Sequence, residues 1–112
     1  MKFRYAIKFV ADVDKAVAFH RDVLGLKLRF QSPGWTEFDT GETTLALHPA
    51  SNGYPPGSIQ LSFHCDDVEA FYAGGEANDV TFTMPPTPLH GTTMARFLDC
   101  EGAETSLGQT PR

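Results

Sequence analysis

The chain has 112 residues, 41% of them hydrophobic, which is the size and composition of one folded domain. Nine Lys and Arg against 14 Asp and Glu give a net charge of −5, and no basic run occurs, so a nucleic-acid partner is excluded. Lys2, Arg4 and Lys8 interrupt the first apolar stretch, and no segment approaches the roughly 20 apolar residues of a membrane span. We therefore expect a soluble protein of a bacterial cytoplasm, with no membrane partner.

The first half of the chain predicts a strand, a helix and three further strands. Residues 2–10 are rich in Phe, Tyr, Ile and Val, as strands are. Asp12 can cap a helix whose apolar positions recur at helical spacing, and Gly25 can end it in a left-handed conformation. His20 lies on the apolar stripe of this helix, so we expect it in the core. Strand-like runs follow at residues 27–31, 35–39 and 43–48, separated by turn-forming residues.

The second half predicts the same order after a Pro- and Gly-rich stretch that ends at Gly57. Asp67 can cap a second helix, in which Gly75 falls on the inward stripe and is expected to allow close approach to a sheet. The strands are expected at residues 58–65, 80–84, 93–98 and 104–107, with a loop at 85–91.

The chain has two cysteines, Cys65 and Cys100, and they stand in no CxxC spacing. Cysteines without such spacing in an intracellular protein are typically reduced and packed in the interior. We expect two reduced, buried thiols.

The repeated element order indicates duplication. Asp12-Val13-Asp14 recurs as Asp67-Val68-Glu69, at the start of each predicted helix. One module of this size has too little surface to bury its sheet face, so two are expected to pack together. We predict an α+β fold of two βαβββ modules that form a cupped, partly open mixed sheet with the helices outside. The single domain spans residues 1–112, with module one at 1–50, a linker at 51–57 and module two at 58–109.

Two short motifs carry a family resemblance. Helix one ends in FHRDVLGLKL (Phe19 to Leu28), and the sequence RFLDCEGAE (Arg96 to Glu104) stands near the C-terminus. Together with the two modules, they make the whole chain resemble the glyoxalase/bleomycin resistance/extradiol dioxygenase group, the vicinal oxygen chelate superfamily. Where that family usually has Phe-Tyr and Asp-Pro-Asp-Gly, this chain has Phe19-His20 and Asp99-Cys100-Glu101-Gly102.

The resemblance implies a divalent metal held by His and Glu side chains at four strand positions. Counting back seven residues from the two capping aspartates gives Tyr5 and Gln60, and the other two positions fall on Ala46 and Ser106. Alanine has no donor atom, and the other three are poor ligands for a divalent ion. A shift of two residues in the last strand would put Glu104 in place of Ser106, which is still one carboxylate. We expect no metal at the usual positions and no cofactor.

A shifted metal site stays open, because side chains two residues apart share a strand face. His48, His64 and Glu104 lie two or four residues from the positions just named and could supply two imidazoles and one carboxylate. Alternatively, His48, beside Pro49, lies at a strand end near solvent, and His64 forms a hydrogen bond with neighbouring backbone. His90, in the predicted loop, is a further acid or base candidate or an exposed loop residue.

These residues predict a small-molecule-binding protein. Tyr5, Gln60 and Ser106 would be polar anchors beside Ala46 and Trp35, in a mostly apolar sheet cleft. The aromatic residues that could line it, or form ordinary core, are Trp35, Phe38, Tyr54 and Phe82. The resemblance implies a bleomycin-resistance-like ligand binder and a homodimer. The alternative is an enzyme of the family, a lyase, isomerase or dioxygenase, that uses the shifted metal or metal-free acid and base residues.

Overall fold

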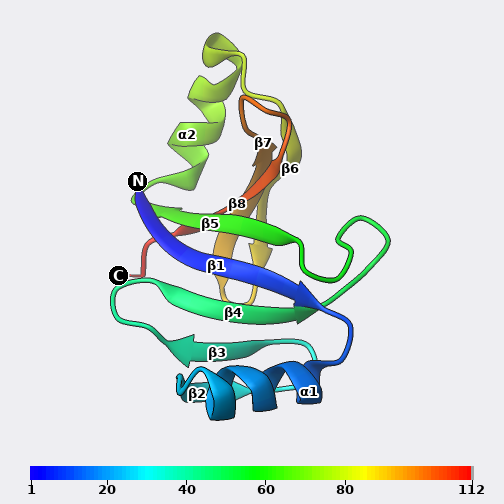
Figure 1. Cartoon of the computed structure of the whole chain (residues 1–112). Helices are drawn as coiled ribbons and strands as arrows, with labels where there is room; N and C mark the ends of the chain where they lie inside the picture. The colour runs from blue at the N-terminus through cyan, green and yellow to red at the C-terminus, as the bar shows by residue number, and fades with distance from the viewer. Residues whose placement is uncertain (112) are drawn as a thin grey trace. The chain divides into compact units, whose positions relative to one another are not determined.

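The structure is a computed structural model that describes residues 1–111 (Figure 1). The chain forms two compact units. The N-terminal unit is Arg4–Ile59, and the C-terminal unit is Met1–Phe3 with the chain from Gln60 onward. Each unit has the βαβββ order, so the α+β fold of two such modules is confirmed.

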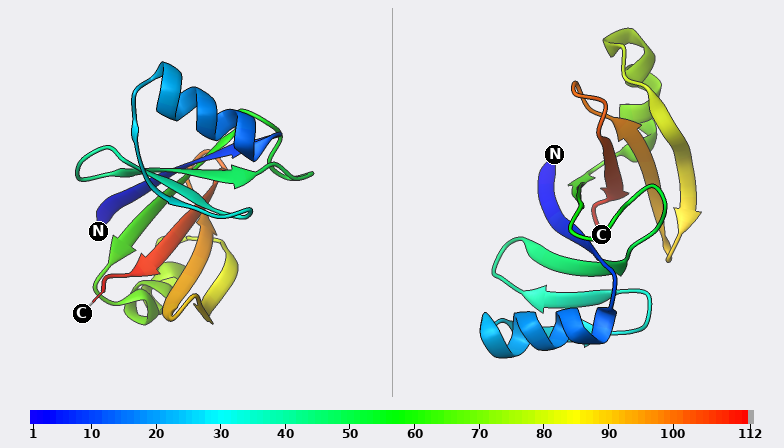
Figure 2. Two further views of the ribbon diagram at one scale, coloured as in Figure 1. Left: turned by 90° about the horizontal axis from the view of Figure 1, so that it is seen from below. Right: turned by 45° about the vertical axis from the view of Figure 1, so that its right-hand side comes forward.

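The N-terminal unit contains a four-stranded mixed sheet in the order β2-β3-β4-β1. The β1 and β4 strands run parallel, and the other two neighbouring pairs are antiparallel. The elements are β1 (Lys2–Val10), α1 (Val13–Ala18), a π-helical segment (Phe19–Val23), β2 (Lys27–Gln31), β3 (Thr36–Asp39) and β4 (Thr44–Pro49). The α1 helix covers one face of this sheet (Figure 2), where Val17 packs against Phe38 and Leu47.

The first helix begins and ends where local chemistry predicts. The Asp12 carboxylate accepts a hydrogen bond from the backbone N–H of Lys15 at 3.0 Å, and Gly25 follows the helix with φ +70°. The last turn widens into the π-helical segment, in which the buried His20 bonds through Nδ1 to the Ala16 carbonyl oxygen at 2.7 Å. The prediction that His20 packs in the core is confirmed.

The C-terminal unit repeats this arrangement with the strand order β5-β8-β7-β6. The β5 and β8 strands run parallel, and the other neighbours are antiparallel. Its elements are β5 (Ile59–Cys65), α2 (Val68–Gly75), a short 3-10 helix (Glu76–Asn78), β6 (Phe82–Leu89), β7 (Thr92–Leu98) and β8 (Glu104–Gln109). The α2 helix packs on one face through Val68 and Phe71, against Leu107 and Phe97.

Gly75 lies at the contact between α2 and its sheet. A Cβ atom built on Gly75 would lie 2.4 Å from Cε2 of Phe82, far inside van der Waals contact, whereas one on Gly74 would meet nothing within 4 Å. The predicted close approach at Gly75 is therefore confirmed.

The predicted loop at 85–91 is wrong, because β6 continues to Leu89. Three prolines lie inside this strand, at positions 85, 86 and 88. The strand is the outermost of its sheet and pairs only with β7, so one side of its backbone needs no donor. Register shifts on both sides of Met84 further accommodate the prolines.

The turn between β7 and β8 corrects the prediction for the cysteines. Oδ1 of Asp99 accepts hydrogen bonds from the backbone N–H groups of Glu101 and Ala103 at 2.8 and 2.9 Å, and Gly102 has φ +79°. Cys100 lies in this turn and is exposed, whereas Cys65 is half-buried. The cysteines are free, but the prediction that both are buried is wrong, because a tight turn presents Cys100 to solvent.

No helix within residues 1–111 combines the length and apolar character needed to cross a membrane.

Candidate functional site

Each sheet has one face covered by its helix and one face without a helix, which we call the open face. In the N-terminal unit the open face carries Ile7, Phe9 and Ala46, which form a buried cluster separate from the core under α1. Half-buried Tyr5 and Trp35 pack against this cluster. The alternation of side chains along strands separates the two faces.

Ala46 lies at the centre of the N-terminal open face. It pairs with Ile7 on β1 and with Glu37 on β3, and it is fully buried. The ring of Tyr5 on β1 and the ring of Trp35, the residue just before β3, meet edge to face with centroids 5.5 Å apart. A methyl group at position 46 leaves room for this contact, because both rings pack against the cluster that contains it.

Further rings extend the aromatic surface. His48 lies 5.2 Å from Phe9 and 6.5 Å from Trp35 between ring centroids. Tyr54 stacks on Phe9 with centroids 4.2 Å apart and an angle of 18° between the rings. The open face of the N-terminal unit thus carries a cluster of five aromatic or imidazole rings, of which Phe9 is buried and the other four are half-buried.

A polar network borders these rings. The Glu37 carboxylate accepts hydrogen bonds from Nε1 of Trp35 at 2.7 Å and from Nη2 of Arg29 at 2.9 Å. The hydroxyl of buried Thr44 accepts from Arg29 at 2.5 Å and from Nη1 of Arg4 at 3.2 Å. The Arg4 guanidinium also lies 4.8 Å from the centroid of the Tyr5 ring. The network fixes the orientation of the Trp35 indole.

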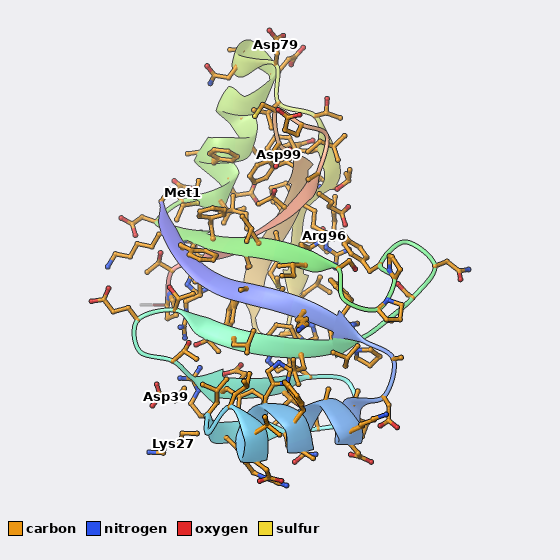
Figure 3. All side chains as sticks on the ribbon, in the orientation of Figure 1. Met1, Lys27, Asp39, Asp79, Arg96 and Asp99 are labelled. Carbon is orange, nitrogen blue, oxygen red and sulfur yellow. The ribbon has the colours of Figure 1, made fainter. Side chains whose placement is uncertain are left out.

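The open face of the C-terminal unit is polar. Its central row runs across three strands, from Ser62 on β5 through Ser106 on β8 to Arg96 on β7, each paired directly with the next. Ser62 and Ser106 are each 3% exposed, and Arg96, labelled in Figure 3, is half-buried. Paired residues of neighbouring strands present side chains to the same face, so the two hydroxyls and the guanidinium lie on one surface.

The rows on either side are also polar. Nε2 of buried Gln60 donates to Glu104 at 3.2 Å, and the Thr83 hydroxyl donates to the other Glu104 oxygen at 2.6 Å. The His64 ring lies over Gly108, since a Cβ there would be 3.1 Å from Cδ2 of that ring. The Glu104 carboxylate is held in place by two donors from different strands.

The predicted site residues divide between the two units. Tyr5, Ala46 and Trp35 lie together on the N-terminal open face, and Gln60 and Ser106 share the C-terminal one. Of the other aromatic candidates, Tyr54 lies on the N-terminal open face. Phe38 and Phe82 instead pack under α1 and α2, so they are core residues rather than site residues.

The three histidine candidates have different surroundings. His48 is half-buried near the end of β4, and its Nδ1 bonds to the Pro49 carbonyl oxygen at 2.8 Å. His64 belongs to the polar open face of the other unit, with Glu104. His90 is exposed in the two-residue turn between β6 and β7, with φ 53°. The combination of His48, His64 and Glu104 as a metal site stays a prediction.

The usual metal positions of the resembled family do not fit a divalent ion here. The Ala46 side chain has no donor atom, and the Tyr5 and Trp35 rings meet beside it. Ser106 and Gln60 contribute only neutral oxygen donors. Within neither unit, over residues 1–111, do three His, Cys, Asp or Glu side chains gather closely enough to hold a metal.

Three charged residues of the open faces, Glu37, Arg29 and Arg96, were not predicted from the sequence. All three are charged residues inside predicted strands, a pattern that usually marks a solvated face. For Glu37 the sequence does contain a signal, because it lies two residues from Trp35 and side chains at that spacing in a strand share a face.

Comparisons with known proteins identify the family. No curated protein matches the chain. Among solved structures, a hypothetical protein from Bacillus halodurans C-125 is similar with a TM-score of 0.80 and 18% identity, over 99% of this chain and 95% of that chain. A methylmalonyl-CoA epimerase from Streptomyces coelicolor, in complex with 2-nitronate-propionyl-CoA, has a TM-score of 0.76 and 22% identity over 100% and 99% of the two chains.

A variant of 4-hydroxymandelate synthase from Streptomyces coelicolor has a TM-score of 0.76 and 22% identity, and the match covers 99% of this chain and 39% of that chain. At these identities the similarity shows a shared fold. A family model matches residues 2–107. The chain therefore belongs to the Glyoxalase/Bleomycin resistance protein/Dioxygenase superfamily.

Proposed function

We propose that this protein binds a small organic ligand with a flat aromatic or unsaturated group on the N-terminal open face, without a metal at the family's usual positions. The observation that carries the proposal is the Trp35 indole. It is half-buried, contacts the rings of Tyr5 and His48, and is fixed through Nε1 by Glu37. A pre-oriented aromatic surface with a few polar groups at its border is typical of small-molecule sites.

The family supports a small-molecule ligand over a macromolecule. Two of the similar structures are named for methylmalonyl-CoA and for 4-hydroxymandelate, both small organic compounds. Drug sequestration, as in the bleomycin resistance branch of the family name, needs binding without chemistry, and the aromatic surface suits that role.

Trp35 makes the proposal directly testable, because it is the only tryptophan of the chain. We expect intrinsic fluorescence to change on titration with flat aromatic compounds and to stay constant with aliphatic compounds of similar size. The midpoint temperature of thermal unfolding should rise with the same compounds, because a ligand that binds only the folded state stabilises it by RT ln(1 + [L]/Kd). The Tyr5→Leu substitution should weaken binding.

The matched control is Phe19→Leu, which removes an aromatic ring that is 50% exposed on the π-helical segment, outside the open face. We expect it to bind the same compounds with unchanged affinity. If Tyr5→Leu and Phe19→Leu weaken binding equally, or if no flat compound changes Trp35 fluorescence, the aromatic surface is not the binding site.

One observation favours an enzyme as the second candidate. The half-buried Glu104 carboxylate is positioned by Gln60 and Thr83. A fixed carboxylate on a polar face can act as a general base without a metal. A Glu104→Gln variant that keeps ligand binding but loses turnover would support this function.

Elemental analysis of protein purified without chelator tests the metal. We expect less than stoichiometric Fe, Ni, Zn and Mn. A stoichiometric ion that is lost on both His48→Ala and His64→Ala substitution would favour the shifted metal site.

A further inference from the structure

Arg96 stands out among the arginines that the structure describes. Arg21 and Arg29 pair with carboxylates at 2.8 and 2.9 Å, and Arg4 bonds to Thr44. Within residues 1–111, Arg96 has no hydrogen bond, ion pair or ring contact. The half-buried Arg96 side chain therefore has five N–H donors available to a partner outside the chain.

The two serines of the same row are also without partners. Ser62 and Ser106 are nearly buried, yet their hydroxyls bond to no residue in the described part of the chain. Among the described residues, the one side-chain polar atom that is fully buried and has no partner is Thr36 Oγ1. The two serine oxygens, which also have no partner, are therefore not fully buried. Both hydroxyls therefore remain accessible to a small ligand.

The carboxylate on the same face does not neutralise Arg96. Glu104 lies on β8, two residues before Ser106, and its two oxygens accept from Gln60 and Thr83. The guanidinium thus keeps its positive charge unpaired beside two hydroxyl donors. Such a combination matches an oxyanion, because Arg binds carboxylate or phosphate oxygens with charge-assisted hydrogen bonds and hydroxyls supply further donors.

We propose that the C-terminal open face binds the oxyanion group of a small organic compound, with Arg96 as the charge partner and Ser62 and Ser106 as hydroxyl donors. The inference goes beyond the proposed function, because it concerns the C-terminal unit alone and does not depend on a ligand at the N-terminal open face. The compound bound there is an organic acid or an organic phosphate rather than a neutral or cationic one.

The test compares benzoate with benzamide, which share a ring and differ in charge. NMR titrations of the full chain should show benzoate shifting the amide signals of Ser62, Arg96 and Ser106, with at least tenfold tighter binding than benzamide. Phenyl phosphate and inorganic phosphate distinguish carboxylate from phosphate preference and an organic ligand from a free anion. The Arg96→Met substitution should weaken benzoate binding about ten- to hundredfold and leave benzamide unchanged.

Two controls separate charge from folding. Arg96→Lys keeps the charge and should retain part of the preference for benzoate. Arg21→Met removes an exposed guanidinium paired with Asp22 and should leave the preference intact. Circular dichroism of each variant verifies the fold.

The inference is overturned if benzamide binds as tightly as benzoate, if Arg96→Met keeps the preference, or if none of the anions shifts the three amide signals. Changes in Trp35 fluorescence with neutral aromatic compounds would then still support the proposed function. If no aromatic compound changes Trp35 fluorescence while benzoate shifts the Arg96 signals, the oxyanion site stands and the aromatic site fails.

Discussion

At the centre of each sheet a small residue lies between equivalent strands of its unit, β1 and β3 in the first and β5 and β7 in the second. Ala46 pairs with Ile7 and Glu37 in the N-terminal unit, and Ser106 pairs with Ser62 and Arg96 in the C-terminal unit. The register is the same in both, but an acidic side chain in one unit corresponds to a basic one in the other. The flanking rows differ similarly, with rings on the first face and amide, carboxylate and imidazole groups on the second.

The two modules differ on their open faces and are alike beneath their helices. Beneath the helices both sheets keep apolar cores, with Leu47 in one and Leu107 in the other, since each helix must bury its apolar stripe. The open faces carry no such requirement. The modules therefore share a scaffold and differ in the chemistry of one face, as expected when function is added to a fold.

The largest expected effect comes from placing a carboxylate at the two central positions. Ala46→Glu would bury a charge directly opposite Glu37 and displace the ring contact of Tyr5 with Trp35, so we expect a loss of about 3 kcal/mol or more in unfolding free energy. Ser106→Glu would lie opposite Arg96 and should cost no more than about 1 kcal/mol. Denaturant unfolding measures both.

The neutral variants Ala46→Gln and Ser106→Gln separate volume from charge. The difference between Glu and Gln should be unfavourable at position 46 and favourable at position 106. Equal effects of the two Glu substitutions would show that the opposite charges of Glu37 and Arg96 do not distinguish the faces.

A smaller effect on stability is expected from substitutions in α2, on the helix-covered side of the C-terminal sheet. Gly75→Ala would bring a Cβ within 2.4 Å of Phe82 and should destabilise the protein by about 1–3 kcal/mol. Gly74→Ala meets nothing within 4 Å and should stabilise it by about 0.5–1 kcal/mol through helix propensity. Thermal and denaturant unfolding of the two variants should shift in opposite directions. A stabilising Gly75→Ala would mean that α2 does not need its close contact with the sheet.

Much of the fold could be predicted from local signals. Both ends of β1 and β2 follow the prediction, and α1 begins after Asp12 because a capping carboxylate and apolar periodicity act within one turn of helix. The strand through Pro85, Pro86 and Pro88 could not be predicted the same way. Proline marks a loop unless the strand lies at the edge of a sheet, and edge position depends on pairing with distant residues.

The residues of the candidate site likewise divide into those that could be predicted from the sequence and those that could not. Tyr5 and Gln60 could be found by counting back seven residues from the two capping aspartates, a spacing that the family resemblance implies. Arg96 could not be identified, since its proposed role depends on pairing with Ser106 ten residues later and on the lack of an ion-pair partner in the described chain. Whether Arg96 has a partner depends on which residues from other strands lie near it, and this cannot be read from the sequence.

Glu37 and Arg96 hold equivalent positions, so their removal compares the two networks. Glu37→Met leaves the Trp35 indole N–H and the Arg29 guanidinium without their acceptor, and we expect a loss of about 1–2 kcal/mol. Arg96→Met removes no hydrogen bond, ion pair or ring contact within the described chain and should change stability by less than about 0.5 kcal/mol. Urea unfolding measures both, and an equal loss would indicate that Arg96 is already paired in the free protein.

The smallest expected effect concerns the imidazoles. In the N-terminal unit His48 stands on β4, two residues after the central Ala46. In the C-terminal unit the equivalent position, two residues after Ser106, is Gly108, and the His64 ring of β5 lies over it. Gly108→Ala places a methyl group 3.1 Å from Cδ2 of that ring, a contact that a small ring rotation relieves, so the cost should be below about 1 kcal/mol. The imidazole proton signals of His64 should shift in NMR spectra while those of His48 stay constant. Unchanged His64 signals would show that the ring does not rest on Gly108, although that contact is what distinguishes its packing from that of His48.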